Sequence, residues 1–360
     1  MVGQNLNGQM DLGAGGVSRR QAMLAAGLGV AAVALTGSAA SAMGTRRVVN
    51  DDPKAGGPGA EASEALGQGV GFYRARIGSI PATIVSDGFA AIAPVQPLFA
   101  PEGKAEEVAA VLRENFLPED KVNIDFNTVL LRIGGEVILV DTGSGISQEA
   151  TIGRLLGNLA AAGVKPAQVT GIIITHAHRD HLFGAVQPDG RASFPNAKVF
   201  ISKTEHDFWM SSNPDLSGAG IPDEWKKAWV SGAQSVLGSL KGSLQLVAPG
   251  DKIVDGIELV GTPGHTPGHL SLVVSSGKDR VLIAGDLAHN HALMFAKPEW
   301  TVAFDSDKKQ AIESRKKMFD RAAADRLRVL AYHMPFPGVG FISRQGSGFR
   351  WNMEPWSWTA

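Results

Sequence analysis

Five short apolar segments of the chain each lead into histidine or aspartate residues. The segments are 137–140, 171–175, 257–260, 281–284 and 329–332, and the polar residues that follow them are Asp141, His176, His265, Asp286 and His333. Short apolar runs bounded by glycine and polar residues are typical of buried strands. We therefore expect packed β-sheets that deliver His and Asp side chains to one shared edge.

The composition excludes several kinds of site and partner. The 360 residues carry 34 basic and 35 acidic side chains, whereas proteins that bind nucleic acid through bulk charge carry an excess of basic residues. The apolar content of 44% is typical of a folded globular protein. Because the chain has no cysteine, disulfides, thiolate metal ligands and cysteine nucleophiles are excluded. We expect no nucleic-acid partner.

Residues 1–42 have the features of a signal peptide. Arg19 and Arg20 precede a weakly apolar run, 22–37, of about 16 residues, which is short for a membrane span. A small-residue cleavage site, 40–42, follows it. The arginine pair resembles a twin-arginine (Tat) signal, which implies export by the Tat machinery to the periplasm or the medium. An ordinary secretory signal and an uncleaved anchor are the alternatives, and we expect no stable membrane insertion.

The remainder of the chain is expected to form one domain behind a linker. Residues 43–70 are rich in Gly, Pro and Ala without apolar periodicity, which predicts a flexible lead-in to a domain over 71–360. Within this domain, turn signals predict a strand over 80–85 with a turn at 86–88, and a β-hairpin over 129–140. Helical patterns cover 151–162 and 308–324.

Four side chains that can bind a metal ion lie within six consecutive residues. They are His176, His178, Asp180 and His181, and imidazole and carboxylate suit zinc, manganese, iron or cobalt. This is more than one tetrahedral ion can use from one loop, so the spacing suggests two ions that share it. A polar surface loop is the simpler alternative. Against it, all nine histidines lie between 176 and 333, and six fall in three motifs at predicted strand ends.

The order of these motifs resembles that of the metallo-β-lactamase-fold hydrolases. The matching motifs are His-Ala-His-Arg-Asp-His at 176–181, Gly-His-Thr-Pro-Gly-His at 264–269, Gly-Asp at 285–286, His333, and Asp-Thr-Gly at 141–143. The resemblance spans roughly residues 70–355. It implies an α/β fold, a four-layer αβ/βα sandwich with two mixed β-sheets and the helices outside, and makes 71–360 the catalytic domain.

The resemblance also assigns roles to individual residues. It implies one metal bound by His176, His178 and His265, a second bound by Asp180, His181 and His333, and Asp286 as the bridge between them. Asp180 and Asp286 are then the expected catalytic carboxylates. Asp141 and His269 would support the ligands from behind.

Further motifs resemble the methyl parathion hydrolase branch of this superfamily. They are Gly-Phe-Tyr-Arg at 71–74, Ser-Asp-Gly at 86–88, Phe-Pro-Asn-Ala at 194–197, Asp-Phe-Trp at 207–209 and Phe-Pro-Gly-Val-Gly at 336–340. Members of that branch are exported, usually dimeric, and hydrolyse organophosphate triesters, while near relatives open lactones or cleave aryl esters. The resemblance implies two divalent metal ions per chain. Zinc is the expected metal, with manganese, iron or cobalt as alternatives. The resemblance also admits a homodimer.

These features predict an exported hydrolase for a small neutral ester, lactone or organophosphate triester. Two metal ions that share a water lower its pKa, so that a metal-bound hydroxide can attack at neutral pH. Trp209 resembles an aromatic pocket residue of the branch, and Phe183 and Phe336, which flank ligand loops, are further pocket candidates. His289 stands where acyl-homoserine lactonases carry a tyrosine, which counts against that particular lactonase mechanism.

Other functions of the same fold stay open. A β-lactamase and an acyl-homoserine lactonase are the nearest alternatives, and a non-catalytic exported binding protein is more remote. All seven expected ligands are present, which favours an enzyme. The near-neutral charge disfavours a nuclease.

Overall fold

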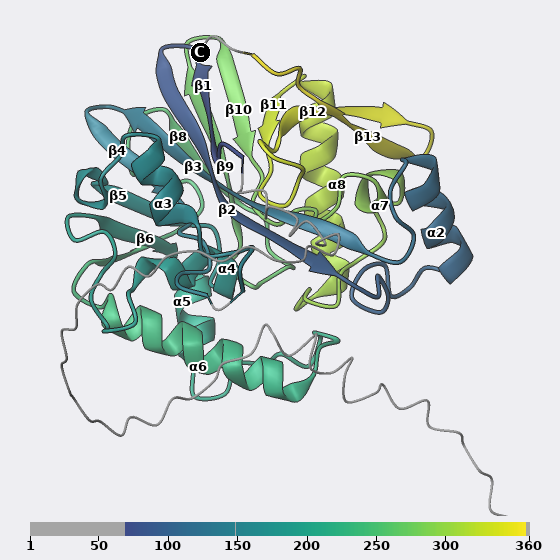
Figure 1. Cartoon of the computed structure of the whole chain (residues 1–360), viewed down its shortest axis with the longest axis horizontal. Helices are drawn as coiled ribbons and strands as arrows, with labels where there is room; N and C mark the ends of the chain where they lie inside the picture. The colour runs from purple at the N-terminus through teal and green to yellow at the C-terminus, as the bar shows by residue number, and fades with distance from the viewer. Residues whose placement is uncertain (1–68, 148, 358–360) are drawn as a thin grey trace, which may run out of the picture. The chain divides into compact units, whose positions relative to one another are not determined.

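The computed structural model describes residues 69–147 and 149–357 (Figure 1). The expected signal peptide, 1–42, lies outside these residues, and so does the expected lead-in, 43–70, apart from its last two residues. Among the helices of the described residues, none is both long enough and apolar enough to cross a membrane.

The first sheet holds seven strands of the described chain in sequence order. They are β1 (Phe72–Ile77), β2 (Ile80–Ile92), β3 (Val122–Ile133), β4 (Glu136–Val140), β5 (Gly171–Ile174), β6 (Lys198–Ser202) and β7 (Leu244–Val247). Strands β1 to β4 pair antiparallel. Strands β4 to β7 pair parallel, because helical crossovers return the chain to the same end of the sheet each time.

The second sheet holds six strands of the described residues in the order β13-β12-β11-β10-β9-β8. They are β8 (Ile257–Gly261), β9 (Leu270–Ser276), β10 (Asp279–Ile283), β11 (Arg328–Leu330), β12 (Val339–Gln345) and β13 (Gly348–Met353). Only the β10–β11 pair is parallel among these strands. Both sheets are therefore mixed.

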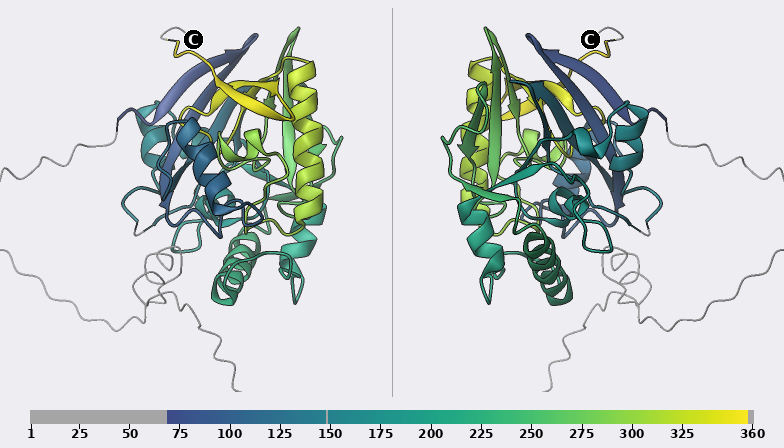
Figure 2. Two further views of the ribbon diagram at one scale, coloured as in Figure 1. Left: turned by 90° about the vertical axis from the view of Figure 1, so that its right-hand side faces the viewer. Right: turned by 90° about the vertical axis from the view of Figure 1, so that its left-hand side faces the viewer.

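Helices cover the outer faces of the two sheets (Figures 1 and 2). The described helices are α2 (Ala105–Glu114), α3 (Leu155–Ala161), α4 (Arg179–Leu182), α5 (Lys203–Met210), α6 (Asp223–Ser239), α7 (Leu293–Ala296) and α8 (Lys308–Ala324), with short 3₁₀ turns η1 (Pro166–Gln168) and η2 (Phe183–Ala185). Leu159, Trp209 and Leu237 pack α3, α5 and α6 onto the first sheet. Met318 and Phe319 pack α8 onto the second sheet. The predicted four-layer sandwich is confirmed.

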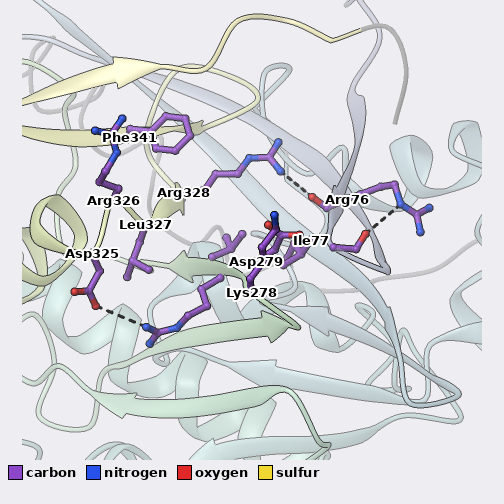
Figure 3. A pocket seen from close by; sticks show the side chains of 12 residues that line it. Arg76, Ile77, Lys278, Asp279, Asp325, Arg326, Leu327, Arg328 and Phe341 are labelled. Carbon is purple, nitrogen blue, oxygen red and sulfur yellow. Dashed lines mark hydrogen bonds and ion pairs between the residues drawn. The ribbon is translucent and has the colours of Figure 1, made fainter.

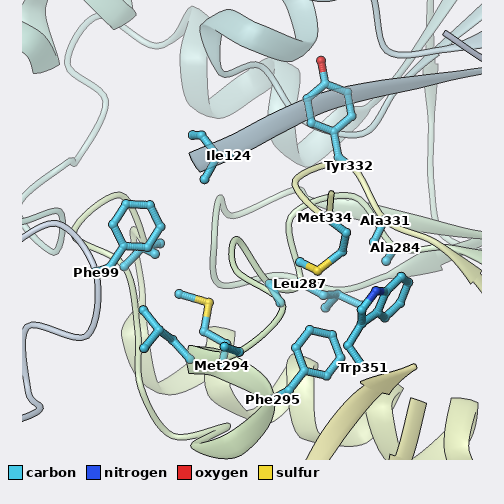
Figure 4. Close-up of a cluster of buried hydrophobic side chains, with 14 of the residues drawn as sticks. Phe99, Ile124, Ala284, Leu287, Met294, Phe295, Ala331, Tyr332, Met334 and Trp351 are labelled. Carbon is cyan, nitrogen blue, oxygen red and sulfur yellow. The ribbon is translucent and has the colours of Figure 1, made fainter. Parts of the chain in front are cut away.

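The core lies in three buried clusters, one between the sheets and one over each outer side. In β3, Val129 and Leu131 point between the sheets, while Leu130 points toward the outer helices. A central strand buried on both faces reads as a continuous apolar run, and this is why the sequence pattern was clear. Figure 4 shows part of the cluster beside the second sheet, where Met294, Phe295 and Trp351 meet.

Two local predictions are confirmed and two are corrected. The hairpin between β3 and β4 and the helix over 308–324 are as predicted. The predicted turn at 86–88 is instead a bulge inside β2, where the pairing register shifts between Ser86 and Gly88. The predicted helix over 151–162 begins only at Leu155, because Gly153 adopts a left-handed backbone with φ of 78° just before it.

Candidate metal centre

The polar residues that follow five strands come together in one buried cluster. Asp141 follows β4, His176 to His181 follow β5, His265 follows β8, Asp286 follows β10 and His333 follows β11. Apart from the half-buried Asp180, all the expected ligands are buried. Each rigid strand end fixes the start of a short loop, so the side chains are held in place by the sheets.

Three imidazole nitrogens form the first group. His178 Nδ1 lies 3.0 Å from His176 Nε2 and 2.9 Å from His265 Nε2. In a tetrahedral zinc site with metal–nitrogen bonds of about 2.0–2.1 Å, ligand atoms lie about 3.3 Å apart. The three nitrogens are therefore close to the spacing that one metal ion requires.

Asp180, His181 and His333 form the second group. Asp180 Oδ2 lies 3.4 Å from His181 Nε2 and 3.5 Å from His333 Nε2. Asp286 reaches both groups, since its Oδ1 lies 3.2 Å from His181 Nε2 and its Oδ2 lies 3.3 Å from His265 Nε2. This placement suits a carboxylate that bridges two ions.

Unpaired polar atoms provide a test of whether these residues fit metal ions. His178 Nε2, His181 Nε2 and Asp286 Oδ1 are buried and make no hydrogen bond to any residue that the structure describes. Buried polar atoms in folded proteins normally have a partner. A cation beside His181 and Asp286 would supply that partner, and imidazole with carboxylate is the donor set that zinc and similar ions prefer. The residues therefore fit two divalent ions.

Charge around the cluster also favours bound cations. Burial alone would lower the pKa of an imidazole, but Asp286 and Asp180 raise the pKa of His181 well above its usual value. Asp286 and Asp305 likewise outweigh burial at His265 and raise its pKa to about 9. The excess of carboxylates thus draws positive charge into a buried site, and a bound metal ion would replace the protons.

Asp141 holds His181 from behind, as the resemblance implied. Its Oδ2 lies 2.8 Å from His181 Nδ1, and its Oδ1 accepts a hydrogen bond from the backbone N–H of Thr175 at 2.8 Å. With Nδ1–H donated to Asp141, His181 presents the lone pair of Nε2 to the cluster. Asp141 has a left-handed backbone with φ of 62°, an uncommon conformation for a residue other than glycine.

His269 holds Asp286 through the backbone. Its Nε2 accepts a hydrogen bond from the backbone N–H of Asp286 at 2.9 Å, and its Nδ1 lies 3.1 Å from the carbonyl oxygen of Thr262. Both ring nitrogens are therefore in use, and burial lowers the pKa of His269 to about 3, so the ring is neutral. Gly285, before Asp286, is required here, because a Cβ would lie 2.6 Å from His269 Nε2.

The structure places the four predicted pocket residues differently from one another. Trp209 is completely buried, with its ring 5.7 Å from that of His178, so it packs in the core and does not line an open wall. Phe183 packs against α6, where a Cβ on Gly232 would meet its ring. Phe336 packs on the cluster between the sheets. Among these four side chains, His289 makes a polar contact with a metal-binding residue.

His289 is part of the ligand cluster. Its Nε2 lies 3.1 Å from Asp286 Oδ2, its side chain is buried, and its ring stacks on that of His333 at a centroid distance of 5.0 Å. A third candidate ligand group contains one atom from each of three residues, and these atoms lie within 4.8 Å of one another. The residues are His265, Asp286 and His289. His289, which the sequence marked as a pocket candidate, therefore lies in direct contact with the metal-binding residues.

Sequence reasoning missed several residues of the site. Asp305, in the loop before α8, has Oδ1 2.8 Å from His265 Nδ1 and so orients that ring. Trp229 of α6 lies with its ring 4.8 Å from that of His178, and Phe304 lies 6.0 Å from Trp229 and 6.3 Å from His289. Trp229 and Phe304 are partly exposed aromatic side chains beside the cluster. Neither motif spacing nor strand ends marked them.

A separate surface cavity lies at the other ends of β10 and β11 (Figure 3). Its volume is about 540 Å³. The lining side chains include Arg76, Arg280 and Arg328, and Arg280 pairs with Asp325 at 3.7 Å. The expected ligands follow the ends of these strands, whereas the cavity borders their beginnings, so it contains none of them.

Comparison with known proteins assigns the fold and the ligand motifs to a family. The sequence model of the Metallo-beta-lactamase superfamily matches residues 127–208 and 213–327, a span that includes His176, His265 and Asp286. This chain belongs to the metallo-beta-lactamase superfamily. The resemblance found in the sequence is thereby confirmed.

Two solved structures and one protein compared by sequence are similar to this chain. AidC, a dizinc quorum-quenching lactonase solved in complex with a product, is 31% identical with a TM-score of 0.76, and the match covers 80% of this chain and 98% of that chain. AbOPH, a hydrolase in the beta lactamase superfamily, is 30% identical with a TM-score of 0.74, covering 81% and 100%. Metallo-beta-lactamase domain-containing protein 1 of Xenopus laevis is 30% identical over 162 residues, covering 44% of this chain and 53% of that protein.

These similarities bear on the predicted branch and activity. The match spans about half the length of the Xenopus relative, whereas it spans nearly all of the two solved structures. The solved structures are of a lactonase and a hydrolase, so the predicted lactonase-like branch is confirmed and the predicted metal-dependent hydrolase agrees with them.

Proposed function

We propose that this chain is a hydrolase that uses two divalent metal ions to open lactones or cleave small neutral esters and phosphotriesters. Zinc is the metal that we expect at both sites. The observation that carries the proposal is the pair of buried ligand groups that Asp286 joins. When bound, the two ions would supply an activated water and an electrophile for the substrate oxygen. The similarity to a dizinc lactonase supports zinc and a lactone substrate.

Other residues of this chain would orient the metal ligands and exclude water from them. Asp141 and Asp305 each accept the Nδ1–H of a ligand histidine, so that the opposite nitrogen of His181 and of His265 faces the metal side. Burial of these side chains keeps bulk water from competing for the ligands. Asp286 could neutralise charge on both ions at once, because its Oδ1 lies beside His181 and its Oδ2 lies within 3.3 Å of both His265 and His333.

The aromatic side chains beside the cluster support a neutral, apolar substrate. Trp229 and Phe304 are partly exposed next to His178 and His289, respectively. An apolar wall beside two cations favours a substrate with one polarisable oxygen and a hydrophobic group to lay against the aromatic rings. An acyl lactone fits this description, and so does an aryl ester, whereas a charged phosphodiester does not.

A substrate panel on metal-free and zinc-reloaded protein tests the proposal. The panel contains acyl-homoserine lactones, simple lactones, aryl esters, methyl parathion, a β-lactam and a phosphodiester. We expect activity on lactones or aryl esters only after zinc is restored. His176→Gln should abolish this activity, and His206→Gln should keep it, because His206 lies on α5 and pairs with Asp207 outside the cluster.

The panel also separates the alternative functions. Zinc-loaded protein that turns over none of these substrates would support a binding protein. A β-lactam as the best substrate would support a β-lactamase, and a phosphodiester as the best substrate would contradict the apolar-wall argument.

We further propose that the chain is exported by the Tat machinery and acts in the periplasm or the medium. The arginine pair, the short apolar run and the small-residue site at 40–42 support this. Arg19→Lys with Arg20→Lys should leave precursor in the cytoplasm, because the Tat receptor discriminates the guanidinium pair, whereas normal export would indicate the general secretory route. Light scattering of the purified protein tests the homodimer that the resemblance admits.

A further inference from the structure

One buried carboxylate next to the metal centre has no role in the chemistry proposed above. Glu205 lies in α5 and its side chain is completely buried. Its Oε1 accepts hydrogen bonds from Trp209 Nε1 at 2.7 Å and from the backbone N–H of Ala177 at 2.9 Å. Its Oε2 accepts from Thr266 Oγ1 at 2.8 Å and from the backbone N–H of Gly268 at 2.9 Å.

Trp209 lies one turn along α5 from Glu205, and the other three partners belong to two loops. Ala177 stands between the ligands His176 and His178, in the loop after β5 of the first sheet. Thr266 and Gly268 belong to the loop after β8 of the second sheet, which carries His265. One carboxylate therefore binds the two loops that supply the first ligand group.

A carboxylate suits this position better than other side chains. All four partners donate, and an ionised carboxylate accepts about four hydrogen bonds without donating any. The amide of glutamine would turn an N–H₂ group toward two of these donors. Gly268 approaches α5 so closely that a Cβ there would lie 2.2 Å from the backbone nitrogen of Glu205, which indicates how tightly the loop is held.

The second ligand group is held by different contacts. His181 is fixed by Asp141 through its ring, and its carbonyl oxygen accepts hydrogen bonds from Thr142 Oγ1 at 2.9 Å and from the Thr142 backbone N–H at 2.8 Å. His333 is fixed through Nδ1, 2.9 Å from the carbonyl oxygen of Asp125. None of these contacts among the described residues involves Glu205.

We propose that Glu205 is a positioning residue that sets the distance between the two loops and thereby tunes the affinity of one metal site, that of His176, His178 and His265. This inference rests on the proposed two-metal function. Ligand atoms must be held to within about 0.5 Å of their working positions, and residues behind the ligands typically contribute 10- to 100-fold in metal affinity. Loss of Glu205 should therefore weaken one metal site and spare the other.

Zinc titration of the metal-free protein against a competing chelator tests this directly. Wild-type protein should bind two equivalents, and Glu205→Gln should weaken one of the two binding steps by roughly 10- to 100-fold while leaving the other unchanged. Asp207→Asn is the matched control on the same helix. Asp207 is half-exposed and pairs with Lys203 on the surface, so both binding steps should keep the wild-type affinity.

A second variant keeps the test decisive if Glu205→Gln does not fold. Thr266→Val removes a single donor to Glu205 Oε2 at nearly constant volume and should weaken the same binding step by a smaller factor. Two unchanged steps in a folded variant, or two steps weakened equally, would overturn the role of Glu205. Wild-type protein that binds no zinc would overturn the proposed function as well, so the two failures are distinguishable.

Discussion

Arg315 on α8 should be essential to the stability of the folded chain. Its guanidinium is buried and donates hydrogen bonds to three backbone carbonyl oxygens, those of Leu287 at 2.6 Å, Trp300 at 2.7 Å and Pro298 at 2.9 Å. It also lies 3.8 Å from the buried carboxylate of Asp305. Arg315 thus ties the segment after the bridging aspartate to the segment that orients His265.

We expect Arg315→Met to lower the free energy of unfolding by about 3–5 kcal/mol, the usual cost of removing one partner from a buried ion pair. The substitution leaves the charge of Asp305 buried without its guanidinium and leaves three carbonyl oxygens without their donor. Arg315→Lys should recover little, because a single ammonium cannot reproduce the fork of a guanidinium.

Urea unfolding of the metal-free protein, followed by tryptophan fluorescence, measures this loss. Arg321→Met is the control on the same helix, since Arg321 pairs with Glu258 at 3.5 Å and the two side chains are 30% and 53% exposed. Its cost should stay within about 1 kcal/mol. Adding Asp305→Asn to Arg315→Met should restore part of the stability by removing the unpaired charge. Equal losses for the Arg315 and Arg321 variants would refute the reasoning.

Three further predictions concern the metal bridge, the aromatic wall and pH. Asp286→Ala should lose at least one equivalent of metal and most activity, because two cations would then face each other unshielded; elemental analysis that finds unchanged metal would refute the bridge. Trp229→Ala should raise KM for acyl or aryl substrates more than it lowers kcat, since it removes binding common to ground and transition states. Steady-state kinetics that show a lower kcat with an unchanged KM would contradict this. Burial raises the pKa of Asp87 from 3.8 to about 6, so its stabilising contribution is full below pH 4 and falls by about 3 kcal/mol as pH rises through 6. In urea unfolding of metal-free protein, the stability of wild type relative to Asp87→Asn should therefore decrease between pH 4 and pH 7, and a difference independent of pH would contradict this.

Elements with local signals could be predicted from the sequence. The hairpin between β3 and β4 is specified by two glycines between apolar runs. Helix α8 begins where predicted because Asp307 caps it, accepting a hydrogen bond from the backbone N–H of Gln310 at 3.0 Å. The expected ligand residues stood out because segments predicted as buried strands lead into them, and the family resemblance then assigned them to two metal ions.

Elements that depend on distant contacts could not be predicted. Ser-Asp-Gly at 86–88 has the composition of a turn, but Asp87 accepts hydrogen bonds from the backbone N–H groups of Ser144 at 2.8 Å and Leu155 at 2.9 Å. These long-range bonds keep the segment inside β2 as a bulge. Asp305 and Glu205 could not be identified for the same reason. His265, which Asp305 orients, lies 40 residues away along the chain, and the donors to Glu205 include two loops distant in sequence.

Each ligand group draws side chains from both sheets, and this imposes an order of events in time. His176 and His178 are synthesised well before His265, and His181 well before His333. The first group needs His265 and the second needs His333, so each is complete only after its ligand from the second sheet has been synthesised and that sheet has packed on the first. Loading of both proposed metal sites would therefore be a late step in synthesis and folding, and a product truncated before residue 333 would retain the first group of histidines while lacking a ligand of the second.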